Sequence, residues 1–182
     1  MSRYHIRQKT LQLTLAALCL ALGLVLPLLT AQVKEIGDSL LPMHFAVLLC
    51  GLLCGPLYGL SVGLVLPFLR SLLFGMPPIY PNAVWMAAEL AAYGLVVGLL
   101  YTRVFPKRPG YTYCSLGIAM LLGRAVWGIA KVLLLGLQDK PFTWEMFLAG
   151  AFLDAIPGIL LQLLLLPPLM LLVERLKQKK GL

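Results

Sequence analysis

The sequence predicts an all-α membrane protein in which six transmembrane helices form one bundle. Of its 182 residues, 60% are hydrophobic and only 12% are charged, whereas soluble domains carry about 25% charged residues. The mean hydropathy is +0.91. Residues 41–101 contain only two full charges, Arg70 and Glu89. These values exclude an ordinary water-soluble fold. No repeat or change in composition divides the chain, so we expect a single domain, residues 1–182.

The first predicted helix covers residues 10–30. A short basic head precedes it, as in a signal peptide, but the apolar run 11–29 exceeds the about 7–15 residues of a signal-peptide core. Further apolar segments follow it. We therefore expect this run to be the first transmembrane helix of the mature protein.

Three helices are predicted in the most apolar stretch, at residues 41–55, 57–74 and 82–104. Gly55-Pro56 separates the first two, because proline cannot continue a straight helix. The uncharged, proline-rich connection 75–81 precedes the third. Glycines recur every four residues in these helices, a spacing that permits close helix packing in lipid. These glycines are Gly51, Gly55, Gly59 and Gly63, with Gly94 and Gly98 in the third helix.

The last two helices are predicted at residues 114–137 and 146–173. The final apolar run is longer than the about 17–25 residues that a spanning helix needs. We expect it to tilt or to include an interfacial turn. Pro157, Pro167 and Pro168 are expected to bend it.

The basic residues predict the orientation of the bundle. Ten of the 15 Lys and Arg residues fall in the head, in the connection after residue 102 and in the tail from residue 174. Only Lys34 and Lys140 lie in the connections that would face the other side of the membrane. Because cytoplasmic loops carry the excess of Lys and Arg, both termini are predicted to be cytoplasmic, in a bacterial cytoplasmic membrane.

Five charged residues fall inside the predicted helices, and such residues are by default functional candidates. Helix geometry places Arg124 near mid-membrane and the others in the outer half. Aromatic and amide side chains lie at similar depths, and together these groups predict a substrate pocket that faces outward. The predicted substrate-binding residues are Arg70, Tyr80, Asn82, Trp85, Glu89, Tyr93, Arg124, Trp127, Lys131 and Asp154.

Structural interpretations compete with this one. The pairs Arg70–Glu89 and Lys131–Asp154 could simply be buried ion pairs, and aromatic residues in such helices are often packing residues. Cys50, Cys54 and His44 are residue types that could form a metal site, but the spacings typical of zinc sites are absent. Metal binding is therefore not expected. No nucleophile elbow, HExxH or P-loop occurs, so the chain is predicted not to be an enzyme.

The sequence resembles the substrate-binding S components of energy-coupling factor (ECF) vitamin transporters. The resemblance rests on six predicted helices in under 200 residues, an Ala17-x-x-x-Ala21 stripe, and the segment LPMHFAVLLCGLLCGPLYGLSVGLVLPFLRSLLFGMPP. It implies that the chain binds a vitamin or vitamin precursor from outside and docks on a membrane scaffold subunit that carries two ATPases. It implies docking through Ala16, Ala17 and Ala21. ATP would be used by the partners, with no cofactor in this chain and no nucleic acid.

The alternative function is a stand-alone, proton-coupled secondary transporter that uses Glu89 or Asp154. A membrane enzyme or assembly factor is a third hypothesis without a catalytic motif to support it. The sequence leaves the vitamin open among riboflavin, pantothenate, a thiamine or pyridoxine precursor and a queuosine precursor. The excess of cations favours an acid. Whether the energising module is dedicated or shared also stays open.

Overall fold

The structure is a computed structural model that describes residues 2–30, 40–104 and 109–179. Every element in these ranges is helical. In chain order they are α1 (Ser2–Thr30), α3 (Pro42–Cys54), α4 (Pro56–Phe74), η1 (Ile79–Ala83), α5 (Val84–Leu99), η2 (Leu100–Val104), α6 (Pro109–Gly136), α7 (Trp144–Leu148), η3 (Ala149–Leu153) and α8 (Ile156–Lys179). The predicted all-α fold is confirmed.

Five helical segments are long and apolar enough to cross a membrane. They are Gln8–Leu28, Pro56–Phe74, Ile79–Val104, Gly110–Gly136 and Trp144–Leu176. The sixth, Pro42–Cys54, has 13 residues, or about 20 Å of helix, less than the hydrocarbon core of a bilayer. Large apolar side chains such as Leu133, Leu153 and Leu164 are more than 60% exposed, which is the surface that lipid would cover.

The helices begin and end differently from the prediction in three places. α1 starts at Ser2 and not near residue 10, since the basic head contains no glycine or proline to stop a helix. α6 begins at Pro109, five residues earlier than predicted, and proline is favoured at the first position of a helix. The last apolar run is divided by a turn at Asp154 and Ala155, before Pro157. The other two prolines stay inside α8.

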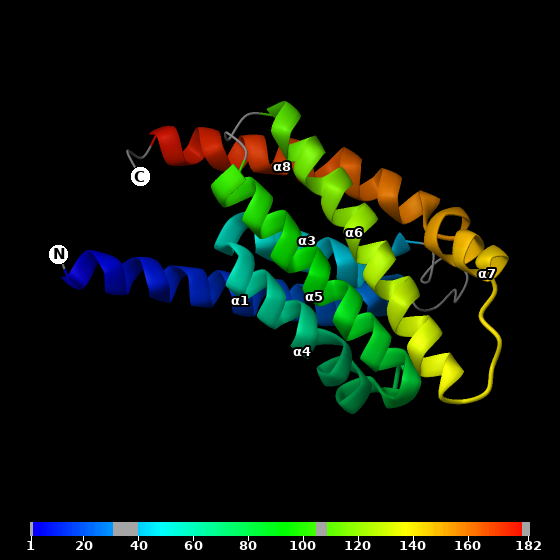
Figure 1. The fold of residues 1–182 in the computed structure, drawn as a ribbon. Coiled ribbons are helices and arrows are strands. Elements are labelled where there is room, and N and C mark those ends of the chain that lie inside the picture. The colour runs from blue at the N-terminus through cyan, green and yellow to red at the C-terminus, as the bar shows by residue number, and fades with distance from the viewer. Residues whose placement is uncertain (1, 31–39, 105–108, 180–182) are drawn as a thin grey trace.

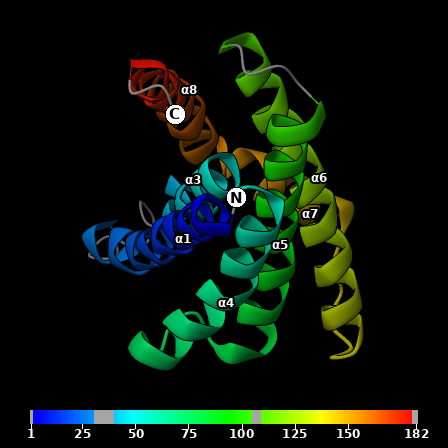
Figure 2. The same ribbon diagram turned by 90° about the vertical axis from the view of Figure 1, so that its left-hand side faces the viewer.

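α5 is the central helix of the bundle and lies between α4 and α6 (Figure 2). Its contact with α4 depends on glycines. A Cβ atom added at Gly59 would lie 2.5 Å from the Gly94 carbonyl oxygen, and one at Gly63 would lie 2.5 Å from the Leu90 carbonyl carbon. The predicted role of the glycines in close packing is therefore confirmed for this pair of helices.

The break between α3 and α4 falls at Gly55, whose φ of 93° is rarely adopted by residues with a side chain. The chain changes direction sharply there (Figure 1), so α3 and α4 are two helices, as Pro56 predicts. α1 packs against both. Cys19, Val47, Leu66 and Leu90, from these three helices and α5, lie in the common apolar core.

The two ends of the described chain lie at the same end of the bundle. Figure 1 shows the start of α1 and the end of α8 at its left-hand side, and both face the viewer in Figure 2. Near that end the Tyr101 hydroxyl of η2 donates a hydrogen bond to the Glu174 carboxylate of α8. This arrangement is the one expected for an even number of crossings.

Candidate substrate-binding site

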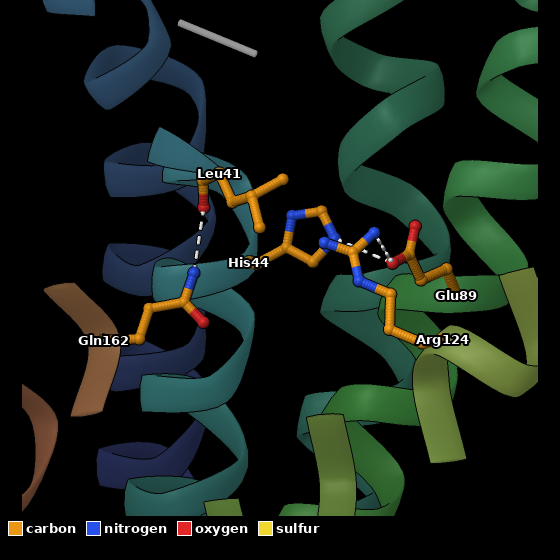
Figure 3. A network of polar contacts seen from close by, with 5 residues as sticks. All are labelled: Leu41, His44, Glu89, Arg124 and Gln162. Carbon is orange, nitrogen blue, oxygen red and sulfur yellow. Dashed lines mark hydrogen bonds and ion pairs between the residues drawn. The ribbon is translucent and has the colours of Figure 1, made fainter. Parts of the chain in front are cut away.

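Glu89 is the centre of a buried polar cluster. It lies on α5, is 1% exposed, and its Oε1 atom contacts Arg124 Nη1 of α6 at 2.9 Å and His44 Nε2 of α3 at 3.2 Å. Figure 3 shows the imidazole and the guanidinium meeting at this one carboxylate oxygen. Three helices are thereby joined by one charged network inside an apolar bundle, where isolated charges are strongly disfavoured.

His44 is held at the start of α3 by an unusual backbone. Leu41 has the left-handed conformation (φ 50°, ψ 50°), which disfavours residues with a side chain by about 1–2 kcal/mol. Its carbonyl accepts hydrogen bonds from the His44 backbone at 3.0 Å and from Gln162 Nε2 of α8 at 3.4 Å (Figure 3). α8 thus helps to fix the helix start that carries His44.

Tyr93 closes the cluster one turn along α5 from Glu89. Its ring is 2% exposed and packs edge-on against His44, with centroids 5.1 Å apart and an interplanar angle of 78°. The ring also lies against α6 at Gly123, where a Cβ atom would be 2.9 Å from three of its carbons. The absence of a side chain at Gly123 is what lets α6 carry Arg124 toward Glu89.

Arg124 has hydrogen-bond donors without a partner among the described residues. Its Nε and Nη2 atoms are buried and have no hydrogen-bond partner among the described residues. Arginine cannot lose its charge in a protein, and its five N–H groups form a fixed fork. Leaving such donors buried and unpaired costs about 1–3 kcal/mol or more. An acceptor group of a ligand would remove that cost.

Lys131 lies on the same face of α6 as Arg124, and its ammonium group is close to three aromatic rings. Its Nζ atom is 4.2 Å from the ring centroid of Trp127, 5.1 Å from that of Trp85 and 5.6 Å from that of Phe142. Cation–π contacts of this kind stabilise an ammonium group by about 0.5–2 kcal/mol. Such an enclosure holds the charge without neutralising it.

The aromatic group continues onto α7. Trp127 lies 6.0 Å from Phe142 and 6.1 Å from Phe147, and Trp144 stacks on Phe147 at 5.1 Å. Between this group and α6 is a largely apolar cavity of about 440 Å³. It is lined by Ala125, Gly128, Ile129, Val132, Leu133, Phe142, Thr143, Trp144 and Phe147. Apart from Thr143 this lining is apolar, and Glu89, Arg124 and Lys131 do not belong to it.

The structure brings six of the ten predicted site residues together. These are Trp85, Glu89, Tyr93, Arg124, Trp127 and Lys131. Whether they bind a ligand stays a prediction.

The other four form no ion pair or ring contact with this group among the described residues. Arg70 turns toward α1, where its Nη1 atom donates to the Leu24 carbonyl at 3.4 Å. Tyr80 is 54% exposed, Asn82 is half-buried and Asp154 is exposed.

The two ion pairs considered as alternatives do not form among the described residues. Glu89 pairs with Arg124 and not with Arg70, because α5 faces α6 at this point while Arg70 points toward α1. Lys131 and Asp154 are in no ion pair within the described ranges. The turn at Asp154 accounts for this, since it interrupts the helix that would have carried the carboxylate inward.

Sequence reasoning missed three contributors to the cluster. His44 is not among the predicted substrate-binding residues, yet it is 4% exposed and contacts Glu89. Phe142 contributes from a polar connection, and Gln162 from the apolar first part of α8. Gln162 could have been found by the reasoning applied to the charges, since a lone amide within a run of leucines also requires a partner.

The three alanines predicted to form a docking stripe on α1 differ in their exposure. Ala17 and Ala21 are exposed, whereas Ala16 is 5% exposed and packs in the core. Ala16 is therefore not available on the surface of α1. Beside the stripe, α1 and α3 form an apolar groove of about 400 Å³ lined by Leu15, Leu18, Cys19, Ala21, Leu22, Val25, Leu49 and Leu53. The docking role of the stripe stays a prediction.

Three of the four cysteines are buried at this contact of α1 with α3, and Cys114 is exposed. No group of three or more His, Cys, Asp and Glu side chains within the described part of the chain could hold a metal ion.

The described chain is thus a helical bundle with five helices long and apolar enough to cross a membrane and with a buried cluster of charged and aromatic side chains. The sequence profile of one family, described as "ECF transporter, substrate-specific component", matches residues 11–170. The chain belongs to this family, as its resemblance predicted. No curated protein and no solved structure matches it significantly.

Proposed function

We propose that this chain captures a vitamin or vitamin precursor outside a bacterial cell and delivers it through an ATP-driven partner module. The partners would be a membrane scaffold subunit and two ATPases, which supply the energy. The chain itself needs no cofactor and catalyses no reaction. Its membership of the substrate-specific components supports the transport role. The observation that carries the capture role is the buried cluster around Glu89, because charged groups are retained within a membrane for function.

The proposed topology has six spans in one domain, with both termini in the cytoplasm. The two ends of the described chain at one end of the bundle support an even number of spans (Figure 1). The short helix α3 would contribute the sixth span, with local thinning of the bilayer accommodating its length. The cluster would then lie in the outer half of the membrane, since His44 is in the first turn of α3.

A stand-alone proton-coupled transporter is the second candidate, favoured by the contact between the buried Glu89 and His44. Buried carboxylates and histidines form proton relays in transporters. Against this, Glu89 also forms an ion pair with Arg124 at 2.9 Å, and protonation of the carboxylate would remove that pair. Asp154, the other residue considered for this role, is exposed.

Two experiments test the proposed function. The first is mass spectrometry of the small molecules released when the purified protein is denatured. A vitamin-like compound in stoichiometric amount would support capture.

The second is transport into vesicles that contain the chain with or without the scaffold and ATPases. Uptake that needs these partners and ATP is expected. Uptake by the chain alone, driven by a proton gradient, would refute the proposal in favour of the second candidate.

A further inference from the structure

Two cationic groups face the same indole ring on α6. Arg124, Trp127 and Lys131 are spaced three and four residues apart, so they follow one another along one face of the helix. The guanidinium carbon of Arg124 lies 5.8 Å from the Trp127 ring centroid and the Lys131 Nζ atom lies 4.2 Å from it. The two positive charges therefore both lie close to the Trp127 ring.

Arg124 and Lys131 both have N–H groups that form no hydrogen bond or ion pair with the described residues, apart from the contact of Arg124 Nη1 with Glu89. The Arg124 side chain is 6% exposed, and its Nε and Nη2 atoms find no hydrogen-bond partner among the described residues. Lys131 has aromatic neighbours but no ion pair within the described ranges. A group that accepts several hydrogen bonds would supply partners for these donors.

The charge balance indicates which kind of acceptor would complete the cluster. Glu89 offsets one of the two positive charges, and its contact with Arg124 uses Nη1. Among Glu89, Arg124 and Lys131, one positive charge remains. Asp154 acts on Lys131 only from a distance, being exposed and outside ion-pair range. A single negative charge would balance the buried groups, and the arginine fork matches the geometry of a carboxylate.

We propose that the ligand of this chain is a carboxylic acid whose carboxylate binds between Arg124 and Lys131, with its apolar part against Trp127 and the neighbouring rings. This inference rests on the proposed capture function and narrows its substrate to monoanionic vitamins or precursors. Arg124 and Lys131 are then the residues that select an acid over a neutral compound of the same shape. A neutral ligand would leave the guanidinium donors and the excess charge unmatched, which disfavours it.

The test is a binding panel sorted by charge. The purified full-length protein in detergent is heated with pantothenate, nicotinate and biotin, each beside its neutral counterpart, namely panthenol, nicotinamide and biotin amide. Riboflavin and pyridoxine represent neutral vitamins, and thiamine represents cations. The change in melting temperature identifies binders, and calorimetric titration gives their affinities. We expect stabilisation by an acid and at least about 30-fold weaker binding of its neutral counterpart, as for loss of one partner of a buried charge pair.

Two variants connect this preference to the site. Lys131→Gln should weaken binding of the acid by at least about 30-fold and remove its advantage over the neutral counterpart, while Lys131→Arg should retain the preference. Lys140→Gln, in the connection before α7, is the matched control and should bind like the parent protein. Melting temperatures measured without ligand show whether each variant is folded.

The possible outcomes separate this inference from the proposed function. Preferential binding of riboflavin, pyridoxine, thiamine or a neutral counterpart would overturn the carboxylate inference and leave the capture function standing. An acid that binds Lys131→Gln as tightly as the parent protein would overturn the assignment to this residue. Stabilisation by no member of the panel would count against both.

Discussion

At the scale of single residues, the cluster is organised by one carboxylate oxygen. Glu89 Oε1 contacts both His44 and Arg124, but the His44 Nε2 and Glu89 Oε1 atoms form no hydrogen bond of ordinary geometry. The network is thus held by charge and burial more than by directed bonds. Buried ion pairs contribute little net stability, but removing one member leaves an uncompensated charge in an apolar environment.

The first prediction concerns that uncompensated charge. Glu89→Gln keeps the shape of the side chain and leaves Arg124 buried without its counterion, so the free energy of unfolding should fall by about 3–5 kcal/mol. Unfolding in increasing concentrations of SDS in mixed micelles measures it. The exposed Glu145→Gln on α7 is the control and should change stability little. The double variant Glu89→Gln/Arg124→Gln should be more stable than Glu89→Gln alone. If it is less stable, the charge interpretation is wrong.

At the scale of helices, the fold depends on how closely α4 and α5 approach. Gly59 and Gly94 bring the two backbones into contact, and a Cβ atom at either position would collide with the other helix. Without a difference in apolarity between lipid and helix surface, such close packing is a main source of helix association in membranes. Because α5 carries Glu89 and Trp85, this contact also determines where those side chains lie.

Gly94→Val should therefore disrupt the bundle. The added side chain has no space against the Gly59 backbone, and we expect a loss of more than about 3 kcal/mol in the free energy of unfolding, or failure to fold. The matched control is Gly117→Ala on α6, where a Cβ atom meets nothing within 4 Å. That control should be neutral or slightly stabilising, since alanine favours helix. Equal stability of Gly94→Val and the parent protein would contradict the packing described for α4 and α5.

A second prediction about the helices concerns the exposed alanines of α1 as a docking surface. Ala17→Trp adds bulk to the surface of α1 without entering the core, because Ala17 is exposed. We expect loss of co-purification with the scaffold and ATPase subunits while ligand binding is retained. Leu122→Trp, at an exposed position on α6, is the control for bulk on a lipid-facing surface. Normal assembly of Ala17→Trp with the partners would exclude this stripe as the docking surface.

At the scale of the whole molecule, the structure places the described ends of the chain together (Figure 1). The connection after α6 and the start of α7 lie at the opposite end, next to the aromatic group around Trp127. The distribution of basic residues predicts that the first end is cytoplasmic. The bundle would then present the Glu89 cluster toward the outside and Tyr101–Glu174 toward the inside.

Cysteine labelling tests this orientation. In a Cys114→Ser background, which removes the exposed native thiol, Lys140→Cys should react with an impermeant maleimide added to intact cells. Gln178→Cys near the end of α8 should react only after the membrane is permeabilised. Parent protein with Cys114→Ser alone gives the background. The reverse pattern of labelling would invert the proposed topology and move the Glu89 cluster to the cytoplasmic half of the membrane.

The class of fold, the positions of most helices and the family could all be predicted from the amino-acid sequence. These depend on properties that act locally or on average along the chain. Apolar length predicts the helices, Gly55-Pro56 predicts the break between α3 and α4, and a charge within an apolar segment marks a residue that needs a partner. Glu89, Arg124 and Lys131 were identified as site candidates for that reason, before any partner was known.

Only the tertiary structure decided which partners meet. Rotation of a helix about its axis leaves its apolar length unchanged, so the sequence could not show that Glu89 faces Arg124 and not Arg70. The enclosure of Lys131 likewise depends on Phe142, which comes from a connection whose path no periodicity predicts. His44 reaches the cluster because an unusual backbone at Leu41 and a hydrogen bond from Gln162 of α8 fix the start of α3. Interactions between residues distant in sequence arise from packing, and packing is a property of the folded chain.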